Sequence, residues 1–187
     1  MDDLIKKVQS GDELAFKQLS QSIQGYLYNT ARTRLNDDDD INDAIQNTMI
    51  ITYQNAKKIK NVQYFKTWMI RVLINECNKI YNSNKKNNEL INKVVTDNDF
   101  NFFDNSIHNV QSKINFDFLI DKLNYDEKIV IILYYNSQFS CSEIAKILNT
   151  SINTVKSRLR RSKEKLKKFY EEGYLYDVKW WFWWKIV

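Results

Sequence analysis

Positively charged side chains are concentrated in one stretch of this 187-residue chain, between Ile152 and Lys168. That stretch holds eight lysines and arginines and a single acid, Glu164. Its apolar residues recur at helical spacing: Ile152, Val155, Leu159 and Leu166. One face of the predicted helix is therefore apolar and the rest is cationic. Such a cationic face binds phosphate groups, for example those of a nucleic-acid backbone.

A shorter helix is predicted directly before the basic one. Ser140 and Glu143 have the spacing of a capping box, and Asn149 stands where the chain must leave that helix with a positive φ. Ser151 is the expected cap of the basic helix. A helix, a turn and a basic helix favour insertion of the second helix into the major groove of DNA. The expected contacts with bases and phosphates are Asn153, Thr154, Lys156, Ser157, Arg158, Arg160 and Arg161. A merely solvated basic face is the alternative, but the capped turn and the clustered arginines disfavour it.

Catalytic and metal-binding patterns are missing from the sequence. Cys77 and Cys141 are far apart and lack histidines at metal-ligand spacing, so they predict neither a zinc site nor a disulfide framework. His108 is the sole histidine and has no Ser or Cys partner nearby. We therefore expect no enzyme activity, no metal and no cofactor.

The composition favours an all-α fold. The chain has no proline and three glycines, so little interrupts long helices, and its 43% hydrophobic content suffices for packed cores.

The start of the sequence, Met1-Asp2-Asp3, lacks the basic and then apolar character of a signal peptide, and we therefore expect a cytoplasmic protein.

The N-terminal half predicts its own helical unit. Asp37 to Asp40 are expected at the start of a helix whose apolar stripe is Ile41, Ile45, Met49 and Tyr53. A following helix over residues 64–75 mixes aromatic with basic side chains, a combination that binds single-stranded nucleic acid. Phe65 and Met69 are expected in the core instead.

A polar segment separates this unit from the basic one. Nine of the 28 residues from Asn82 to Asn109 are Asn, which predicts a linker with a possible short helix around residues 89–95. We therefore divide the chain into a helical domain at 1–83, a flexible linker at 84–112, a helix-turn-helix domain at 113–172 and an aromatic tail at 173–187.

The aromatic tail contains an apolar block, Trp180 to Trp184, that is too short to span a bilayer. Four explanations stay open for it: packing on the preceding domain, which we slightly favour, contact with a membrane surface, binding of a regulator, or a cloning or frameshift remnant.

Three motifs in this order resemble the extracytoplasmic-function (ECF) group of bacterial sigma factors, which keep regions 2 and 4 of larger members of the sigma-70 family. DAIQNTMIITY (43–53) resembles the helix that binds the clamp helices of the largest polymerase subunit, and YFKTWMIRVLINEC (64–77) resembles the promoter-melting helix. EIAKILNTSINTVKSRLRRSKEKL (143–166) is similar to the family's helix-turn-helix for the −35 element.

The resemblance implies the role of each surface. Region 4 would read the −35 element and region 2 would melt the −10 element, while core polymerase, bound at its clamp helices and flap, supplies the chemistry. The implied −10 residues are Lys60, Asn61, Val62 and Gln63 in the loop that receives a flipped base, and Trp68, Arg71, Asn75 and Lys79 on the adjacent helix. The implied polymerase contacts are Asp43, Gln46 and Asn47, the last standing where many members carry Glu. Similar proteins are commonly held inactive by an anti-sigma protein, often a membrane-anchored one.

Two other functions remain as alternatives. A stand-alone helix-turn-helix regulator would explain residues 143–159 but leaves the N-terminal motifs unexplained. A membrane-surface or protein-interaction module driven by the aromatic tail is the second.

Overall fold

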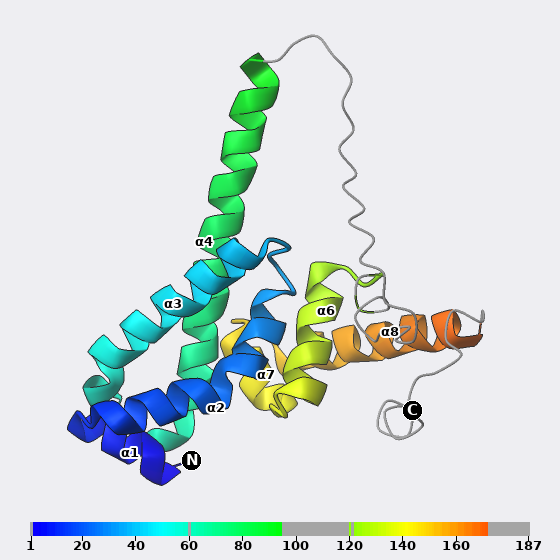
Figure 1. Ribbon diagram of the computed structural model, residues 1–187. Helices are drawn as coiled ribbons and strands as arrows, with labels where there is room; N and C mark the ends of the chain where they lie inside the picture. Colours follow the sequence, from blue (N-terminus) through cyan, green and yellow to red (C-terminus); the bar gives the residue numbers. More distant parts are fainter. Residues whose placement is uncertain (1, 60, 95–119, 121, 172–187) are drawn as a thin grey trace, which may run out of the picture.

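The computed structural model describes residues 2–59, 61–94, 120 and 122–171. Throughout these ranges every regular element is a helix, which confirms the all-α prediction of two small helical units (Figure 1). The first unit consists of α1 (Asp2–Ser10), α2 (Glu13–Ala31), α3 (Asp38–Asn55), the 3-10 turns η1 (Ala56–Lys58) and η2 (Val62–Tyr64), and α4 (Phe65–Val94). The second consists of α6 (Tyr125–Ile131), its π-helical continuation η3 (Ile132–Asn136), α7 (Cys141–Ile147) and α8 (Ile152–Glu171).

The core of the first unit forms where the apolar stripes of its helices meet. α1 packs on α2, and α3 packs on α4. The large side chains at the centre are fully buried: Ile5, Leu19, Ile23, Ile41, Phe65, Met69 and Leu73. The burial of Phe65 and Met69 confirms that they are core residues.

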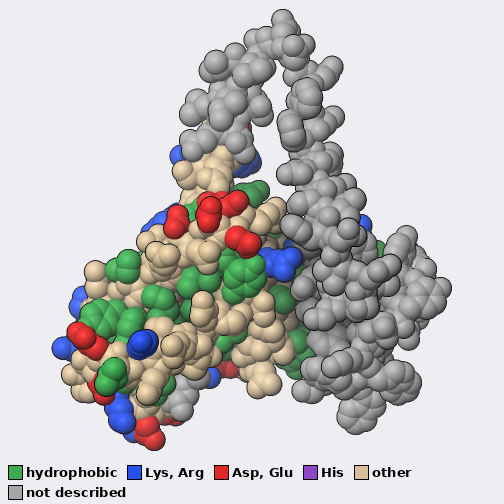
Figure 2. All heavy atoms as spheres, in the orientation of Figure 1, with side chains coloured by type: hydrophobic (Ala, Val, Ile, Leu, Met, Phe, Trp, Pro, Cys, Tyr) green, Lys and Arg blue, Asp and Glu red, His purple; other side chains and the backbone are tan. Residues whose placement is uncertain are grey.

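The acidic run caps α3 as expected. The backbone N–H groups of Asp39 and Asp40 donate to Asp37 Oδ1 at 3.0 and 3.1 Å. Figure 2 shows the acidic side chains gathered over the start of this helix. Negative charge is favoured there because the first backbone amides of a helix have no partners within the helix.

The stripe predicted for α3 is shifted from the one observed. Ile41 is buried, but the rest of the buried row is Ala44, Thr48 and Thr52. Ile45 and Met49 lie at its margin, and Tyr53 is 44% exposed. The small side chains allow α3 to approach its neighbours closely. A pattern of apolar residues alone does not predict this buried row, because two of its members are threonines.

α4 continues through residues where a linker was expected to begin. It runs without interruption from Phe65 to Val94, so residues 84–94 are its last turns, and the short helix expected at 89–95 is part of it as far as the described residues reach, at residue 94 (Figure 1). No proline or glycine interrupts this stretch, and Lys85 and Glu89 add an i,i+4 pair at 3.9 Å. Residues 95–112 and the aromatic tail lie outside the described residues, and the four-part division of the chain stays a prediction.

The helix-turn-helix forms as its caps predicted. Ser140 and Glu143 make both hydrogen bonds of a capping box at the start of α7. Asn149 has φ +50°, and Ser151 Oγ accepts from the backbone N–H of Thr154 at 3.0 Å at the start of α8.

Among the described helices, none is both long enough and apolar enough to cross a membrane.

Candidate nucleic-acid interface

The outer face of α8 presents most of the residues expected to contact DNA. Asn153, Lys156, Arg160 and Arg161 are exposed, while Thr154 and Ser157 are half-buried near the helix start. Ser157 Oγ donates to the Thr154 carbonyl at 2.9 Å, so this hydroxyl is engaged with the helix backbone. Arg160 forms an i,i+4 pair with Glu164 at 3.1 Å. The helix thus offers cations and a polar first turn on one side.

Arg158 lies differently from its neighbours. Its Nη2 is 2.6 Å from Oδ2 of Asp126 on α6, and only 21% of its side chain is exposed. The guanidinium therefore points toward α6, where an acid already occupies it, instead of outward from the recognition face.

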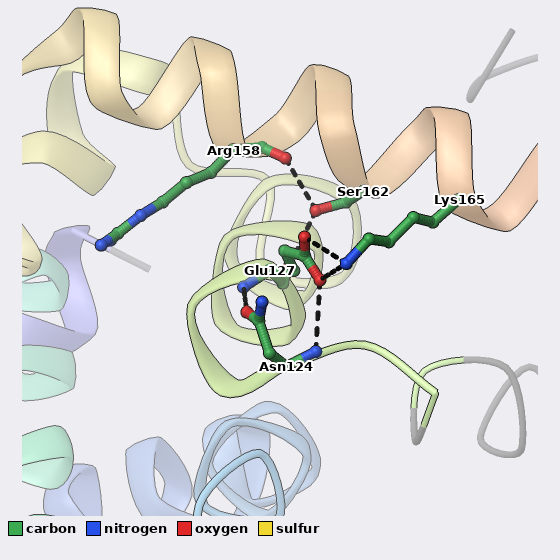
Figure 3. Close-up of polar contacts among 5 residues, drawn as sticks. All are labelled: Asn124, Glu127, Arg158, Ser162 and Lys165. Atoms are coloured by element: carbon green, nitrogen blue, oxygen red, sulfur yellow. Dashed lines mark hydrogen bonds and ion pairs between the residues drawn. The ribbon is translucent and has the colours of Figure 1, made fainter.

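Glu127 attaches α8 to α6, a role that the sequence analysis missed (Figure 3). Its carboxylate accepts from the backbone N–H of Asn124 at 3.2 Å and lies 2.8 Å from Nζ of Lys165. Its backbone carbonyl accepts from Ser162 Oγ at 3.3 Å. Asn124 followed three residues later by Glu127 is a capping-box spacing and could have revealed the cap. Lys165, counted above among the phosphate-binding charges, serves this contact.

The described part of the loop before α4 contains three of the four residues implied to receive a flipped base, and two of them are exposed. Lys60 lies outside the described residues. Asn61 and Gln63 are exposed, and Asn61 Oδ1 accepts from the Gln63 N–H at 3.0 Å, which fixes the turn. Val62 is half-buried against the core.

The adjoining face of α4 divides its residues between packing and solvent. Trp68 is half-buried, its ring centroid 6.3 Å from that of Phe65, so part of the indole remains accessible. Arg71 and Asn75 are exposed. Lys79 pairs with Glu76 at 2.6 Å, and the Glu76 side chain is 10% exposed. Arg71, Asn75 and Lys79 are thus exposed on this face, Lys79 as the partner of Glu76.

The exposed face of α3 carries the residues implied to contact polymerase. Asp43, Gln46 and Asn47 are all exposed and share one side of the helix. Ile50 and Tyr53 extend that side, and Figure 2 shows hydrophobic side chains exposed over α2 and α3. A polar face that continues into apolar side chains suits a protein partner.

Burial and hydrogen bonding shift the pKa values of several titratable groups in the described part of the chain. Burial raises the pKa of the Cys77 thiol to about 12, so it stays protonated at neutral pH. The hydrogen bonds from Ser140 hold the pKa of Glu143 below its usual value. A cluster of acids, cysteines and histidines that could hold a metal ion does not occur among the described residues.

The two units lie against each other, and their buried apolar side chains form one continuous core. α4 packs on α7, and a cavity of about 500 Å³ lies between the units. Arg71 and Asn75 of α4 line one side, and Asn149, Thr150 and Arg158 line the other. The helix-turn-helix therefore covers part of the face of α4 described above.

Comparison with known proteins places both units in one family. Sigma-70 region 2 matches residues 19–87, and Sigma-70 region 4 matches residues 113–166. The chain is 25% identical over 174 residues to the ECF RNA polymerase sigma factor SigW of Bacillus subtilis, covering 88% of this chain and 93% of that protein. It is also 25% identical to the ECF RNA polymerase sigma-E factor of Haemophilus influenzae, covering 88% and 92%.

Two solved structures share the fold. CnrH, in complex with the cytosolic domain of CnrY, superposes with a TM-score of 0.64 at 20% identity over 92% of this chain and 97% of that one. The sigma factor RpoE, in complex with the anti-sigma factor NepR from Bartonella quintana, gives 0.60 at 21% identity over 83% and 98%.

The chain belongs to the sigma-70 family, in its extracytoplasmic-function group of transcription initiation factors.

Proposed function

We propose that this sigma factor directs core RNA polymerase to promoters through three separate surfaces. The exposed face of α8 reads the −35 element, the η2 loop and outer face of α4 melt the −10 element, and the exposed face of α3 binds polymerase. The observation that supports this most directly is the cationic outer face of α8 directly after a capped helix and turn. Phosphate contacts from Lys156 and Arg161 would fix the register, and Asn153 at the first turn would lie nearest the base edges.

Duplex opening is assigned to the side chains of α4 and the preceding loop. An unstacked base needs an aromatic surface and a nearby cation, and Trp68 and Arg71 lie within one turn of each other on α4. Asn61 and Gln63, whose turn is fixed by their own hydrogen bond, supply polar groups for a flipped base.

Core polymerase supplies the phosphodiester chemistry, and this chain supplies recognition and opening. We therefore propose no enzyme activity for it, and a cytoplasmic location, where polymerase and the chromosome are found. An anti-sigma partner is proposed as well, since both structural relatives cited above were solved with a bound protein, one of them named an anti-sigma factor.

Run-off transcription with purified core polymerase tests the proposal. Templates carry the upstream sequence of the chain's own gene and a genomic library, with the protein present or omitted. The proposal predicts specific transcripts only when the protein is present, and their loss on Asn153→Ala combined with Arg161→Ala. The matched control is Lys6→Ala combined with Gln24→Ala, which removes one cation and one amide from exposed positions on α1 and α2. Absence of transcripts and of core binding, with specific duplex binding retained, would favour the stand-alone regulator.

A further inference from the structure

A groove with an aromatic wall lies on the second unit, where η3 leads into α7. Its volume is about 460 Å³, and its lining residues are Tyr134, Tyr135, Gln138, Phe139, Ser140 and Glu143. Tyr134 is 39% exposed, and its ring meets that of Tyr135 edge to face, with the centroids 4.9 Å apart. Aromatic side chains are enriched where a protein binds another polypeptide segment. The wall is therefore suited to cover a further apolar side chain.

The backbone beside the groove is irregular in two places. η3 is a single π-helical stretch, Ile132–Asn136, and it carries both tyrosines of the wall. Gln138, which follows it, has φ +58°, a conformation that residues other than glycine rarely adopt. π-helical turns and positive φ values occur frequently at binding sites, where they place side chains that a regular helix would not. Both features thus favour a binding role for this groove.

The opposite side of the groove offers a hydrogen-bond acceptor. Oε2 of Glu143 accepts from the backbone N–H and the hydroxyl of Ser140, at 2.8 and 2.6 Å. None of the described residues donates to the other carboxylate oxygen, Oε1. A tryptophan side chain matches this combination, because its ring packs on aromatic surfaces while its N–H needs an acceptor when it is buried.

The chain itself contains a block of such side chains. Trp180 to Trp184 are five consecutive aromatic residues, four of them tryptophans, and they lie outside the described residues. Each side chain of this kind buries roughly 150–250 Å² when it packs. A contiguous apolar patch of several such side chains is rarely left uncovered in a soluble monomer. The block therefore needs a surface that covers it.

The aromatic block can reach the groove from the end of α8. Nζ of Lys163 lies 5.9 Å from the ring centroid of Tyr135, so the groove lies beside the middle of this helix. α8 ends at Glu171, eight residues or about 12 Å further on. Trp180 follows nine residues later, and an extended chain of that length spans up to about 30 Å. The connection is thus long enough for the block to return.

We propose that the groove between η3 and α7 is the docking site of the chain's own aromatic tail, with an indole ring packed on Tyr134 and its N–H donating to Glu143. The docked tail covers its apolar side chains and closes the groove to other proteins. This inference is independent of the proposed function, because it depends only on the groove and on the sequence of the tail.

The test places a fluorophore on the wall of the groove in the full chain. Gln138→Cys combined with Cys141→Ser provides one exposed thiol for bimane, since Cys77 is buried and its pKa is raised to about 12. Tryptophan quenches bimane on contact, so quenching reports an indole in the groove. The same label at position 6, from Lys6→Cys on α1, is the matched control.

The reference variant has the four tail tryptophans replaced by Leu. The remaining tryptophan, Trp68 on α4, is present in both proteins and cancels in the comparison. The proposal predicts that bimane at position 138 is quenched, that the quenching is lost in the reference variant, and that position 6 shows no difference. Circular dichroism confirms that each variant is folded.

A groove variant tests the contact with Tyr134. Tyr134→Ser removes the exposed ring of the wall and should lower the ratio of quenched to unquenched bimane, measured from fluorescence lifetimes, about twofold to tenfold, the range expected for one aromatic pair. Tyr53→Ser removes a ring of similar exposure, 44%, from α3 and should leave the ratio unchanged.

Three results would overturn the proposal. Bimane at position 138 that is equally bright with and without the tail tryptophans would mean that the tail does not enter the groove. Quenching that disappears on dilution would identify the occupant as the tail of a second copy. Binding of the chain to phosphatidylglycerol vesicles through the tail tryptophans, with no quenching at position 138 before vesicles are added, would assign the tail to a membrane surface instead.

Discussion

The ammonium of Lys165 on α8 lies 2.8 Å from both carboxylate oxygens of Glu127 on α6, whose side chain is only 5% exposed. The same carboxylate caps α6 through the N–H of Asn124. One buried acid thus starts a helix and holds the recognition helix against it. Because a buried carboxylate is unfavourable without partners, the two helices are coupled through this group.

Replacing Lys165 should therefore lower the free energy of unfolding, although the residue belongs to the cationic stretch of α8. Lys165→Met leaves the Glu127 carboxylate without its cation, and we expect the free energy of unfolding to fall by about 1–3 kcal/mol. Lys156→Met removes the same charge at an exposed position and should change it by less than about 0.5 kcal/mol. Urea unfolding followed by circular dichroism measures both, and equal stabilities would contradict the role given to Glu127.

Phosphate contacts on α8 should be visible in the salt dependence of DNA binding. If Arg161 neutralises one phosphate, Arg161→Ala should lower the slope of log K against log salt by about 0.9. Arg158→Ala should have a smaller effect, because Asp126, on α6 of the same unit, already occupies that guanidinium. Affinities of holoenzyme for promoter duplex at several salt concentrations provide the slopes. Lys6→Ala, a change to an exposed cation on α1, is the control, and an Arg161→Ala slope equal to that control would remove Arg161 from the interface.

Local sequence signals predicted the elements well, and long-range contacts account for what they missed. The capping box at Ser140, the positive φ at Asn149 and the cap at Ser151 depend on neighbours within three residues, so the helix-turn-helix could be derived. The stack of Arg34 between Tyr81 and Tyr125 joins three distant parts of the chain, and no local pattern encodes it. The inward turn of Arg158 toward Asp126 is likewise tertiary.

Asn47 offers a test of the polymerase-binding face of α3. It is exposed beside Gln46, and a carboxylate there could form a charge-assisted hydrogen bond that the amide forms more weakly. We expect Asn47→Glu to tighten core binding by about threefold to tenfold, the gain of roughly one such bond, and Asp43→Ala to weaken it. Gln24→Glu adds the same charge on an exposed part of α2 and should change nothing. Biolayer interferometry with immobilised core polymerase measures the affinities; a gain shared by Gln24→Glu would indicate a general charge effect instead.

The capping box of α7 should make stability depend on pH in a defined direction. The hydrogen bonds from Ser140 lower the pKa of Glu143 below its ordinary value of 4.5, so the folded state favours the carboxylate. The stabilisation is therefore present above about pH 4.5 and is lost as the pH falls through the lowered pKa. The difference in unfolding free energy between wild type and Glu143→Gln should be largest near pH 7 and shrink in acid. Ser140→Ala should cost about 0.5–2 kcal/mol, while Ser142→Ala, on the exposed side of α7, should not. If the difference in unfolding free energy between wild type and Glu143→Gln stays constant from pH 7 to pH 3, the hydrogen bonds between Ser140 and Glu143 do not stabilise the folded state.

The two cysteines should react with alkylating agents at very different rates. Cys141 is half-buried near the start of α7, whereas Cys77 is buried in α4 with its pKa raised from 9.0 to about 12. Since the thiolate is the reactive form, a rise of this size leaves roughly a thousandth of the usual thiolate at neutral pH, in addition to the steric protection. Iodoacetamide at pH 7.5, followed by mass spectrometry of the peptides, should therefore label Cys141 at least about 100-fold faster. In guanidinium chloride the two rates should converge, which controls for the local sequence. Rapid labelling of Cys77 in the folded protein would mean that the inner face of α4 opens in solution far more often than its packing indicates.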